Sequence, residues 1–309
     1  MSKIENVSRR DVLRAGGGVF VLATTLSACG QSETGVPEAI EPAAKALSKE
    51  LEDLNLFVAI NEEGAVRIMC HRAEMGQHAR TGMARVIADE LEADWDKIDV
   101  VQTEGTDKFG DQNTDGSTTI RADFTRLRRI GASARSMLEQ AAATEWGVPV
   151  GECKAMMHEV VHEASGRKLG YGALAAAAAA LDAPAYEGEA LAGGAEPTYR
   201  LKSPSEFRYI GKATPSIDLD AMLVGKAVYG QDLTRPGMKY AVIARSPVLY
   251  GKVVSFDADA ARATPGVVDV MELPIGDRKG GFNPLGGVAV IAENTWAAIE
   301  GRNALSIEW

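Results

Sequence analysis

The order of hydrophobic patterns between residues 66 and 101 constrains the fold of this chain more than any other feature. An apolar run at 66–70 predicts a strand, and a polar loop around Gly76 follows it. A helix is predicted next, and residues 98–101 predict a further strand. Strands and helices therefore alternate along this part of the chain. The apolar face of the predicted helix consists of Met83, Val86, Ile87 and Leu91.

Further elements are predicted on either side of this unit. Residues 55–60 predict a strand that pairs with 66–70 as a hairpin, because the turn-forming residues 61–64 lie between them. Gly147 and Pro149 are typical of the end of a helix. Additional helices are predicted at 132–146, 173–181, 257–263 and 296–305, and additional buried strands at 240–244 and 287–291.

Length and composition indicate a globular protein with two domains. The chain has 309 residues, and domains commonly have about 150 residues. Hydrophobic residues make up 46% and charged residues 25%, which is ordinary for globular proteins. A Gly- and Pro-containing stretch at 187–204 has little apolar pattern, so we place one domain at 54–205 and a second at 206–309. The predicted fold class is α+β.

The charge balance excludes one class of partner. The formal net charge is −10, whereas electrostatic binding to nucleic acid requires clustered Lys and Arg. The sequence therefore predicts no nucleic-acid partner. Three cysteines are too few for a disulfide framework, and burial is the expected role of Cys70 and Cys153.

The N-terminal residues 1–29 predict an export signal. Arg9 and Arg10 precede an apolar stretch at 19–26, which is much shorter than the roughly 20 residues needed to span a bilayer. The paired arginines resemble a twin-arginine signal, and the alternative is a chance pair before a buried helix. The residues before Cys29 resemble a lipobox, so we expect export to the periplasm. Cys29 is then either lipidated, as a membrane anchor, or part of a cleavage site without lipid. Residues 30–53 are predicted to be a linker.

A second motif suggests a metal site. His158, Glu159 and His162 match the HExxH pattern of zinc peptidases, which requires both histidines on one face of a helix. Val160 and Val161 are β-branched, and residues 154–163 fit a hairpin with a turn near His158 better. We therefore expect two solvent-facing hairpin histidines and keep a zinc peptidase as a remote alternative.

Two loops carry the functional hypothesis. Met75, Gly76 and Gln77 lie between a strand and a helix, where free backbone N–H groups and the helix dipole suit an anion. Gly76 permits close approach of a ligand, and Gln77 adds an amide that donates and accepts. The alternative is a tight turn before a core helix. A second polar loop is typical of phosphate sites, with a solvated surface loop as its alternative; it contains Gly116, Ser117, Thr118 and Thr119. The two loops form one site only if they meet in space.

Several runs together resemble a known family. The chain resembles the molybdopterin-binding subunits of the xanthine dehydrogenase and aldehyde oxidase family, and it is most similar to the branch of the isoquinoline 1-oxidoreductase β-subunit and aldehyde-oxidising relatives. The second half resembles the α/β hammerhead domain of that family. The resemblance extends from about residue 54 to 309. Its motifs are RAEMGQ (72–77), VIADEL (86–91), RRIGASAR (128–135), WGVP (146–149), GKAVYGQD (225–232), PGM (236–238), RSP (245–247), PGV (265–267) and NTWAA (294–298).

The resemblance implies a cofactor and a reaction. Relatives bind molybdenum on a molybdopterin, here expected in the cytosine dinucleotide form, and hydroxylate an aldehyde or N-heteroaromatic substrate with water as the oxygen source. Their electrons pass to an iron–sulfur small subunit. By motif position, Met75, Gly76 and Gln77 would line the cofactor, while residues 116–119 would hold its phosphates and pterin. An exported cofactor enzyme also has reason to use a route for folded proteins.

Two departures from the family pattern matter. Relatives usually have Gly-Gln-Gly where this chain has Gly-Gln-His78. Relatives also continue for several hundred residues, and the sequence contains no counterpart of their Gly-x-Gly-Glu catalytic segment, so we assign no catalytic residue and give Glu74 no such role. The chain is expected to be the N-terminal portion of a large subunit, inactive alone, with the remaining C-terminal molybdopterin-binding portion as its partner. The alternative is a non-catalytic cofactor-binding or assembly module.

Overall fold

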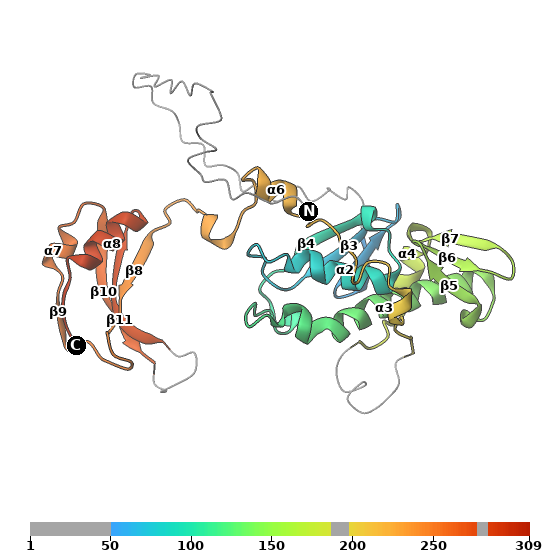
Figure 1. Cartoon of the computed structure of the whole chain (residues 1–309), viewed down its shortest axis with the longest axis horizontal. Coiled ribbons are helices and arrows are strands. Elements are labelled where there is room, and N and C mark those ends of the chain that lie inside the picture. The colour runs from blue at the N-terminus through green and yellow to red at the C-terminus, as the bar shows by residue number, and fades with distance from the viewer. Residues whose placement is uncertain (1–50, 187–197, 277–283) are drawn as a thin grey trace, which may run out of the picture. The chain divides into compact units, whose positions relative to one another are not determined.

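The computed structural model of the chain describes residues 51–186, 198–276 and 284–309 (Figure 1). Arg9, Arg10 and Cys29 lie outside the described residues, as does most of the predicted linker. Within the described ranges, we find no helix with the length and apolar character needed to cross a membrane. The expected mixture of helices and strands is confirmed.

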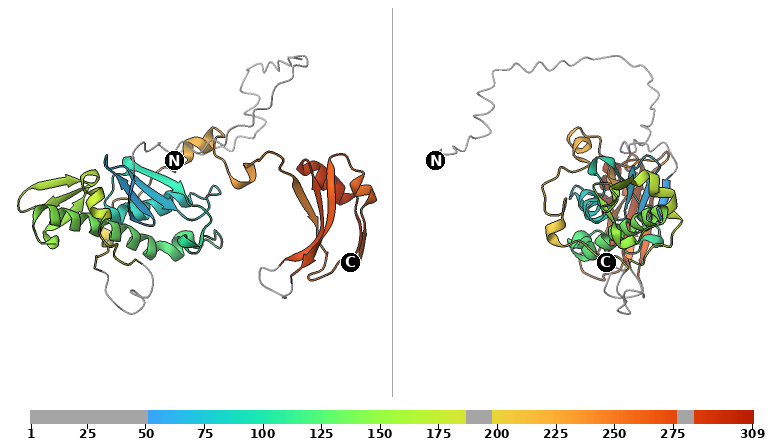
Figure 2. Two further views of the ribbon diagram at one scale, coloured as in Figure 1. Left: turned by 180° about the vertical axis from the view of Figure 1, so that it is seen from behind. Right: turned by 90° about the vertical axis from the view of Figure 1, so that its right-hand side faces the viewer.

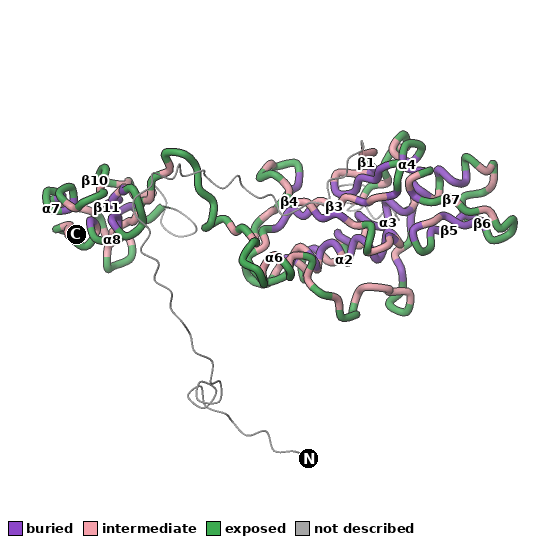
Figure 3. Tube along the Cα trace, turned by 90° about the horizontal axis from the view of Figure 1, so that it is seen from above, coloured by how far each residue is buried: buried purple, intermediate pink, exposed green. Residues whose placement is uncertain are grey.

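A four-stranded sheet forms the base of the first half. Its order is β1 (Leu51–Asn55), β2 (Val58–Asn61), β3 (Val66–Cys70) and β4 (Ile98–Gln102). Neighbours pair antiparallel except β3 and β4, which are parallel. The hairpin of β2 and β3 is confirmed. All residues of β2 and every second residue of β3 are buried, and Figure 3 shows buried residues along β3 in purple.

The single strand predicted at 55–60 is wrong, because the chain turns at Leu56. The Asn55 side-chain oxygen accepts hydrogen bonds from the backbone N–H of Phe57 and of Val58, at 2.9 and 3.0 Å. An asparagine that binds the backbone two or three residues ahead favours a turn over a continuous strand. The extra strand β1 therefore begins at Leu51, inside the stretch predicted as linker.

Two helices cover this sheet and touch each other closely (Figures 1 and 2). Helix α2 (Ala79–Leu91) connects β3 to β4, and helix α3 (Thr118–Trp146) follows β4. A Cβ on Gly131 would lie 2.3 Å from the Ile87 carbonyl oxygen, so glycine allows this contact. Helix α3 ends at Gly147, as predicted, but it begins 14 residues before the predicted start at residue 132.

The rest of the first half lies against the other end of α3. Strands β5 (Cys153–Met156), β6 (Glu159–His162) and β7 (Arg167–Gly170) form a meander, which confirms the predicted hairpin. Helix α4 (Tyr171–Ala179) follows and packs on α3 and β1. Cys70 and Cys153 are buried, as expected.

Residues 202–210 pack against α2 and are held there by buried charged groups. Lys202 Nζ donates to the Asp89 carboxylate at 2.6 Å, and the backbone N–H groups of Tyr209 and Ile210 donate to the same carboxylate. These hydrogen bonds hold the pKa of Asp89 below its usual range even though burial alone would raise it. The backbone N–H of Ile217 also donates to Thr81, so contacts with α2 continue beyond the predicted boundary at 205/206. That boundary stays a prediction.

The second half contains helix α6 (Leu219–Leu223) and a smaller mixed unit. A three-stranded antiparallel sheet has the order β10 (Val267–Ile275), β11 (Leu285–Ala292) and β8 (Tyr240–Ala244). Helix α8 (Thr295–Asn303) packs on β8 and β11 (Figure 2). The strands and helices predicted in this half are confirmed in kind. Its remaining elements are β9 (Ser255–Asp257), α7 (Asp259–Arg262) and β12 (Ser306–Glu308).

Candidate functional site

The two loops singled out in the sequence follow neighbouring parallel strands. The first loop, residues 71–78, joins β3 to α2, and the second loop, residues 103–117, joins β4 to α3. Because β3 and β4 are parallel, both loops leave the carboxyl edge of the sheet. Ligands of α/β proteins commonly bind outside this edge. The topology therefore brings the loops to the position expected of a binding site.

Direct contacts show that the loops lie side by side. The Ala73 backbone N–H donates to the Thr114 hydroxyl at 3.0 Å. The Arg72 guanidinium donates to the Asn113 carbonyl oxygen and lies 3.3 Å from the Asp111 carboxylate. The condition that the sequence left open, contact between the two loops in space, is met.

The backbone N–H groups at the start of α2 already have a hydrogen-bond partner, although we expected them to be free. One oxygen of the Glu74 carboxylate accepts from the backbone N–H of Gly76 and of His78, at 2.8 and 2.9 Å. The other oxygen accepts from the Arg80 N–H at 3.1 Å. The N–H groups expected to be free for an anion are therefore already bound to a carboxylate of the same loop, and that expectation is wrong for α2. A carboxylate is favourable here because it faces the positive end of the helix dipole.

Met75, Gly76 and Gln77 form the exposed tip of the first loop. The Gln77 amide donates to the Ala73 carbonyl oxygen at 3.0 Å and accepts from the Met75 N–H at 2.7 Å. Gly76 has φ +95°, and no described atom lies within 4 Å of where its Cβ would be. The loop is thus closed on itself by hydrogen bonds while the space above Gly76 is open.

His78 explains the departure from Gly-Gln-Gly in backbone terms. Its φ is +65°, a left-handed conformation that glycine adopts without strain and other residues adopt rarely. The side chain is exposed. A histidine is therefore accommodated at this position, at the cost of local backbone strain.

The start of α3 remains without a side-chain cap within the described part of the chain. Gly116 and Ser117 are exposed and have φ values of +52° and +57°. Thr118 and Thr119 belong to the helix, which corrects their placement in the loop. The Thr118 hydroxyl donates to the Asp115 carbonyl oxygen at 2.8 Å, and Thr119 is buried. Of the two helix starts, that of α3 is the better place for an anionic group.

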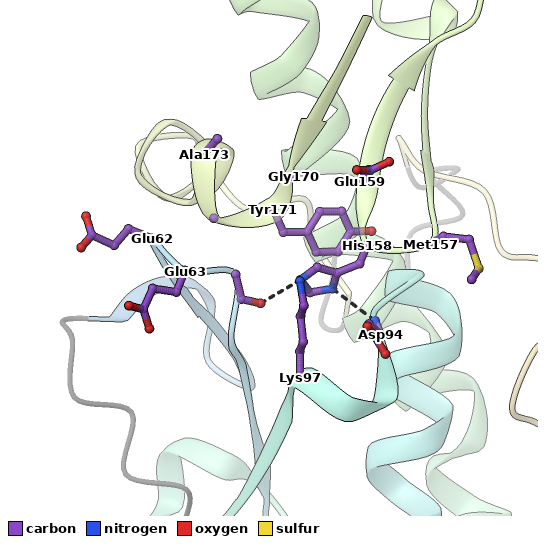
Figure 4. Close-up of a pocket in the computed structure, with 12 residues that line it drawn as sticks. Glu62, Glu63, Asp94, Lys97, Met157, His158, Glu159, Gly170, Tyr171 and Ala173 are labelled. Atoms are coloured by element: carbon purple, nitrogen blue, oxygen red, sulfur yellow. Dashed lines mark hydrogen bonds between the residues drawn. The ribbon is translucent and has the colours of Figure 1, made fainter. Parts of the chain in front are cut away.

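His158 lies in a polar cavity of about 270 Å³ at a different place in the fold (Figure 4). Its Nδ1 accepts from the Asp94 backbone N–H at 3.2 Å, so Nε2 carries the proton and donates to the Gly64 carbonyl oxygen at 2.8 Å. Burial, with a smaller contribution from the nearby positive charge of Lys97, lowers the pKa of His158 to about 4. His158 is therefore a neutral side chain that links its own hairpin turn to the backbone at Gly64 and at Asp94 by hydrogen bonds.

The zinc peptidase hypothesis is wrong. The motif lies on a hairpin, and both histidines are buried, whereas we expected them to face solvent. His162 Nδ1 contacts the Ser165 hydroxyl at 2.7 Å, and its Nε2 contacts the Glu152 carboxylate at 2.8 Å. All four ring nitrogens thus have protein partners. Among the residues described, no group of three or more His, Cys, Asp or Glu side chains is arranged to hold a metal ion.

Sequence reasoning missed the residues that join the loops. Arg72 donates to the Asp123 carboxylate through Nη2 at 2.8 Å and through Nε at 3.2 Å, and both side chains are buried. Arg72 lies within the run that carried the family resemblance, but nothing in that run identifies its partner. Asp123 lies 51 residues away. A charged residue two positions after a buried strand was the available signal.

Comparison with known proteins identifies the two halves. The molybdopterin cofactor-binding domain family matches residues 28–210, and the aldehyde oxidase and xanthine dehydrogenase a/b hammerhead domain matches residues 224–308. The chain belongs to the xanthine dehydrogenase and aldehyde oxidase family of molybdopterin-binding proteins. The expected order, a molybdopterin-binding domain followed by a hammerhead domain, is confirmed.

Three relatives support this assignment. The isoquinoline 1-oxidoreductase β-subunit of Brevundimonas diminuta is 33% identical over 94% of this chain and 40% of its own length. The membrane-bound aldehyde dehydrogenase (pyrroloquinoline-quinone) of Gluconacetobacter polyoxogenes is 33% identical over 82% of this chain and 31% of its own length. A nicotinate dehydrogenase subunit of Pseudomonas putida is 24% identical over 100% of this chain and 24% of its own length. The chain thus spans well under half the length of each.

Proposed function

We propose that the first and second loops together hold part of a molybdopterin cofactor with its molybdenum. Family membership supports this proposal, but the observation that carries it is the direct contact between Ala73 and Thr114. Both loops leave the carboxyl edge of the parallel strands β3 and β4, and that contact joins them. One extended ligand can then touch both.

The described residues fit an anionic pterin cofactor at two points. The α3 start has exposed Gly116 and Ser117 and no capping side chain among the described residues, so we place phosphate oxygens there. The open space above Gly76 suits the flat pterin, and the Gln77 amide can exchange its loop partners for ligand atoms. Met75, which is 62% exposed, would lose contact with water when this site is covered.

The reaction proposed for the whole assembly is oxidative hydroxylation of an aldehyde or N-heteroaromatic compound, with water as the oxygen source. The cofactor, when bound, supplies the redox chemistry, and the chain supplies binding and orientation. The names of the relatives, which mention isoquinoline, aldehyde and nicotinate, support these substrate classes. We assign no described residue a catalytic role and expect the isolated chain to be inactive.

The proposed partners follow from the same reasoning. They are an iron–sulfur small subunit that accepts electrons and a C-terminal molybdopterin-binding portion that completes the site. Relatives named as subunits support multi-subunit assembly. We also propose the cytosine dinucleotide form of the cofactor, export by the twin-arginine route through Arg9 and Arg10, a periplasmic location, and lipidation at Cys29.

Metal and pterin analysis tests the cofactor proposal against its alternative. The chain is purified together with the products of its neighbouring genes, and molybdenum and pterin are measured per mole of protein. Stoichiometric amounts of both support the molybdenum hydroxylase. Their absence from a complex that contains the partners contradicts it and favours an assembly module without cofactor.

A further inference from the structure

We infer that Arg72 is a positioning residue that fixes the separation of the two loops by binding Asp123 at the start of α3. The inference rests on the proposed function for its consequence, cofactor retention. Its structural part, control of the loops by one buried guanidinium, stands on the contacts of Arg72 alone. From within the first loop, the Arg72 side chain binds both the second loop and α3.

The geometry of Arg72 spans three segments. Nη2 and Nε both donate to one oxygen of Asp123 on α3, at 2.8 and 3.2 Å. Nη1 donates to the Asn113 carbonyl oxygen and lies 3.3 Å from Asp111, both in the second loop. Because the guanidinium is rigid and planar, these contacts fix the distance from the first loop to the second loop and to α3 together.

Burial makes this arrangement stiff. The Arg72 side chain is 3% exposed and that of Asp123 is 13% exposed. Burial by itself would raise the pKa of Asp123, but the hydrogen bonds and positive charge of Arg72, with His71 close by, hold it below its ordinary value. The carboxylate therefore stays charged, and separating the pair would leave a buried charge without its partner.

A second arginine reinforces the same junction from the opposite direction. Arg126 lies three residues after Asp123, on the same face of α3. Its Nη1 contacts His71 Nε2 at 3.1 Å, and its Nη2 donates to the Phe109 carbonyl oxygen of the second loop at 3.3 Å. The first turns of α3 thus bind the first loop through Asp123 and Arg126 and the second loop through Arg126. Arg72 is the only one of the two arginines that belongs to a loop.

The consequence is a fixed gap for the ligand. Binding sites hold their ligands well only when supporting residues keep the contacting groups within about 0.5 Å of their working positions. A lysine at position 72 keeps the charge but presents one point donor, so it cannot bind Asp123 and Asn113 in the same geometry. We expect Arg72→Lys to fold while its second loop moves more freely.

Hydrogen exchange of the full chain tests the structural part without cofactor. The matched control is Arg135→Lys. Arg135 is likewise a buried arginine bound to a carboxylate, but it lies on α3, and its partner Glu90 is near the end of α2 that is away from the loops. We expect backbone amides of residues 111–117 to exchange about tenfold faster in Arg72→Lys and at the wild-type rate in Arg135→Lys. Unchanged exchange in Arg72→Lys, or equal acceleration in both variants, would overturn the inference.

Cofactor retention tests the consequence. Molybdenum and pterin are measured in the complex of wild type and both variants, and Asp123→Asn replaces Arg72→Lys if the latter does not fold. Loss of most cofactor from the Arg72 or Asp123 variant, at wild-type content in Arg135→Lys, supports positioning. Equal content in all proteins overturns it. A wild-type complex without cofactor contradicts the proposed function instead, and the exchange experiment still decides whether Arg72 controls the loops.

Discussion

At the residue scale, hydrogen bonds to the backbone decide the roles of two side chains that the sequence had singled out. The His158 imidazole has both nitrogens satisfied by backbone groups and stays neutral. The Glu74 carboxylate, to which we assigned no catalytic role, caps α2 by accepting three backbone N–H groups. In both cases the partners are backbone atoms. A sequence motif does not encode such partners. The HExxH motif of this chain therefore lies on a hairpin whose histidines make structural hydrogen bonds, and it is not arranged as a metal site.

His158 gives the fold a pH dependence of known sign. Burial lowers its pKa to about 4 from an ordinary 6.5, so the unfolded chain takes up a proton before the folded chain does. The contribution of the neutral His158 to the free energy of unfolding is therefore fully present above pH 6.5, and about 3 kcal/mol of it is lost as the pH drops to 4. Urea unfolding of wild type and His158→Asn at pH 7.5 and 4.5 measures this contribution. Asparagine is the chosen replacement because it tolerates the φ of +71°.

The expected result is that the stability advantage of wild type over His158→Asn shrinks by about 2–3 kcal/mol at the lower pH. Titrating groups away from His158 are common to both proteins and cancel in the comparison. An advantage that is the same at both pH values would contradict a neutral, buried His158.

Gln77 provides the residue-scale test of the cofactor site. We expect Gln77→Ala to lower the molybdenum and pterin content of the purified complex several-fold, because the amide is lost from the loop tip. His158→Ala is the comparison, since it lies in a separate cavity. Content is measured per mole of folded protein. An equal loss in both variants would argue against a site at residues 75–77.

At the element scale, periodicity predicted several of the elements but missed others, such as β10, and it missed the start of α3 and the break between β1 and β2. The α2 helix and strands β3 and β4 were found because one face of each is buried. The start of α3 was missed because residues 118–131 are rich in charge, and several of those charges bind partners distant in sequence, such as Glu90. The strand break after Asn55 depends on one side-chain hydrogen-bond geometry. Both misses arise where polar contacts override an apolar pattern.

The contact of α2 with α3 gives the element-scale prediction. Gly131→Ala would place a Cβ 2.3 Å from the Ile87 carbonyl oxygen, so the helices must separate. We expect a loss of about 1–3 kcal/mol in the free energy of unfolding, measured by urea titration. Gly151→Ala is the control, because no described atom lies within 4 Å of its Cβ position. A Gly131 variant as stable as the control would mean that the helices pack differently.

At the scale of the whole molecule, the chain combines a molybdopterin-binding domain with a hammerhead domain and spans 40% of the length of its isoquinoline 1-oxidoreductase relative. The candidate site is open to solvent, because the residues proposed to form it are exposed: Met75, Gly76, Gln77, Gly116 and Ser117. An open half-site is consistent with the proposal that a further molybdopterin-binding portion completes it.

Export gives the prediction at this scale. We expect Arg9→Lys combined with Arg10→Lys to abolish transport of the folded chain to the periplasm, because the twin-arginine route reads the arginine pair. Cell fractionation and immunoblotting measure the distribution. Lys3→Arg, which keeps the charge and leaves the pair intact, is the control. Periplasmic protein at wild-type amounts in the double variant would mean that the pair has no role.

The amino-acid sequence by itself determined the order of most strands and helices, the family, and the two loops that matter, because hydrophobic spacing and glycine positions are local properties. Only the tertiary structure decided that these loops touch, that Glu74 already fills the α2 start, and that Arg72 binds Asp123. Those facts depend on parallel pairing of β3 with β4 and on the packing of α3 against α2. Chain folding, and not spacing along the chain, sets such distances.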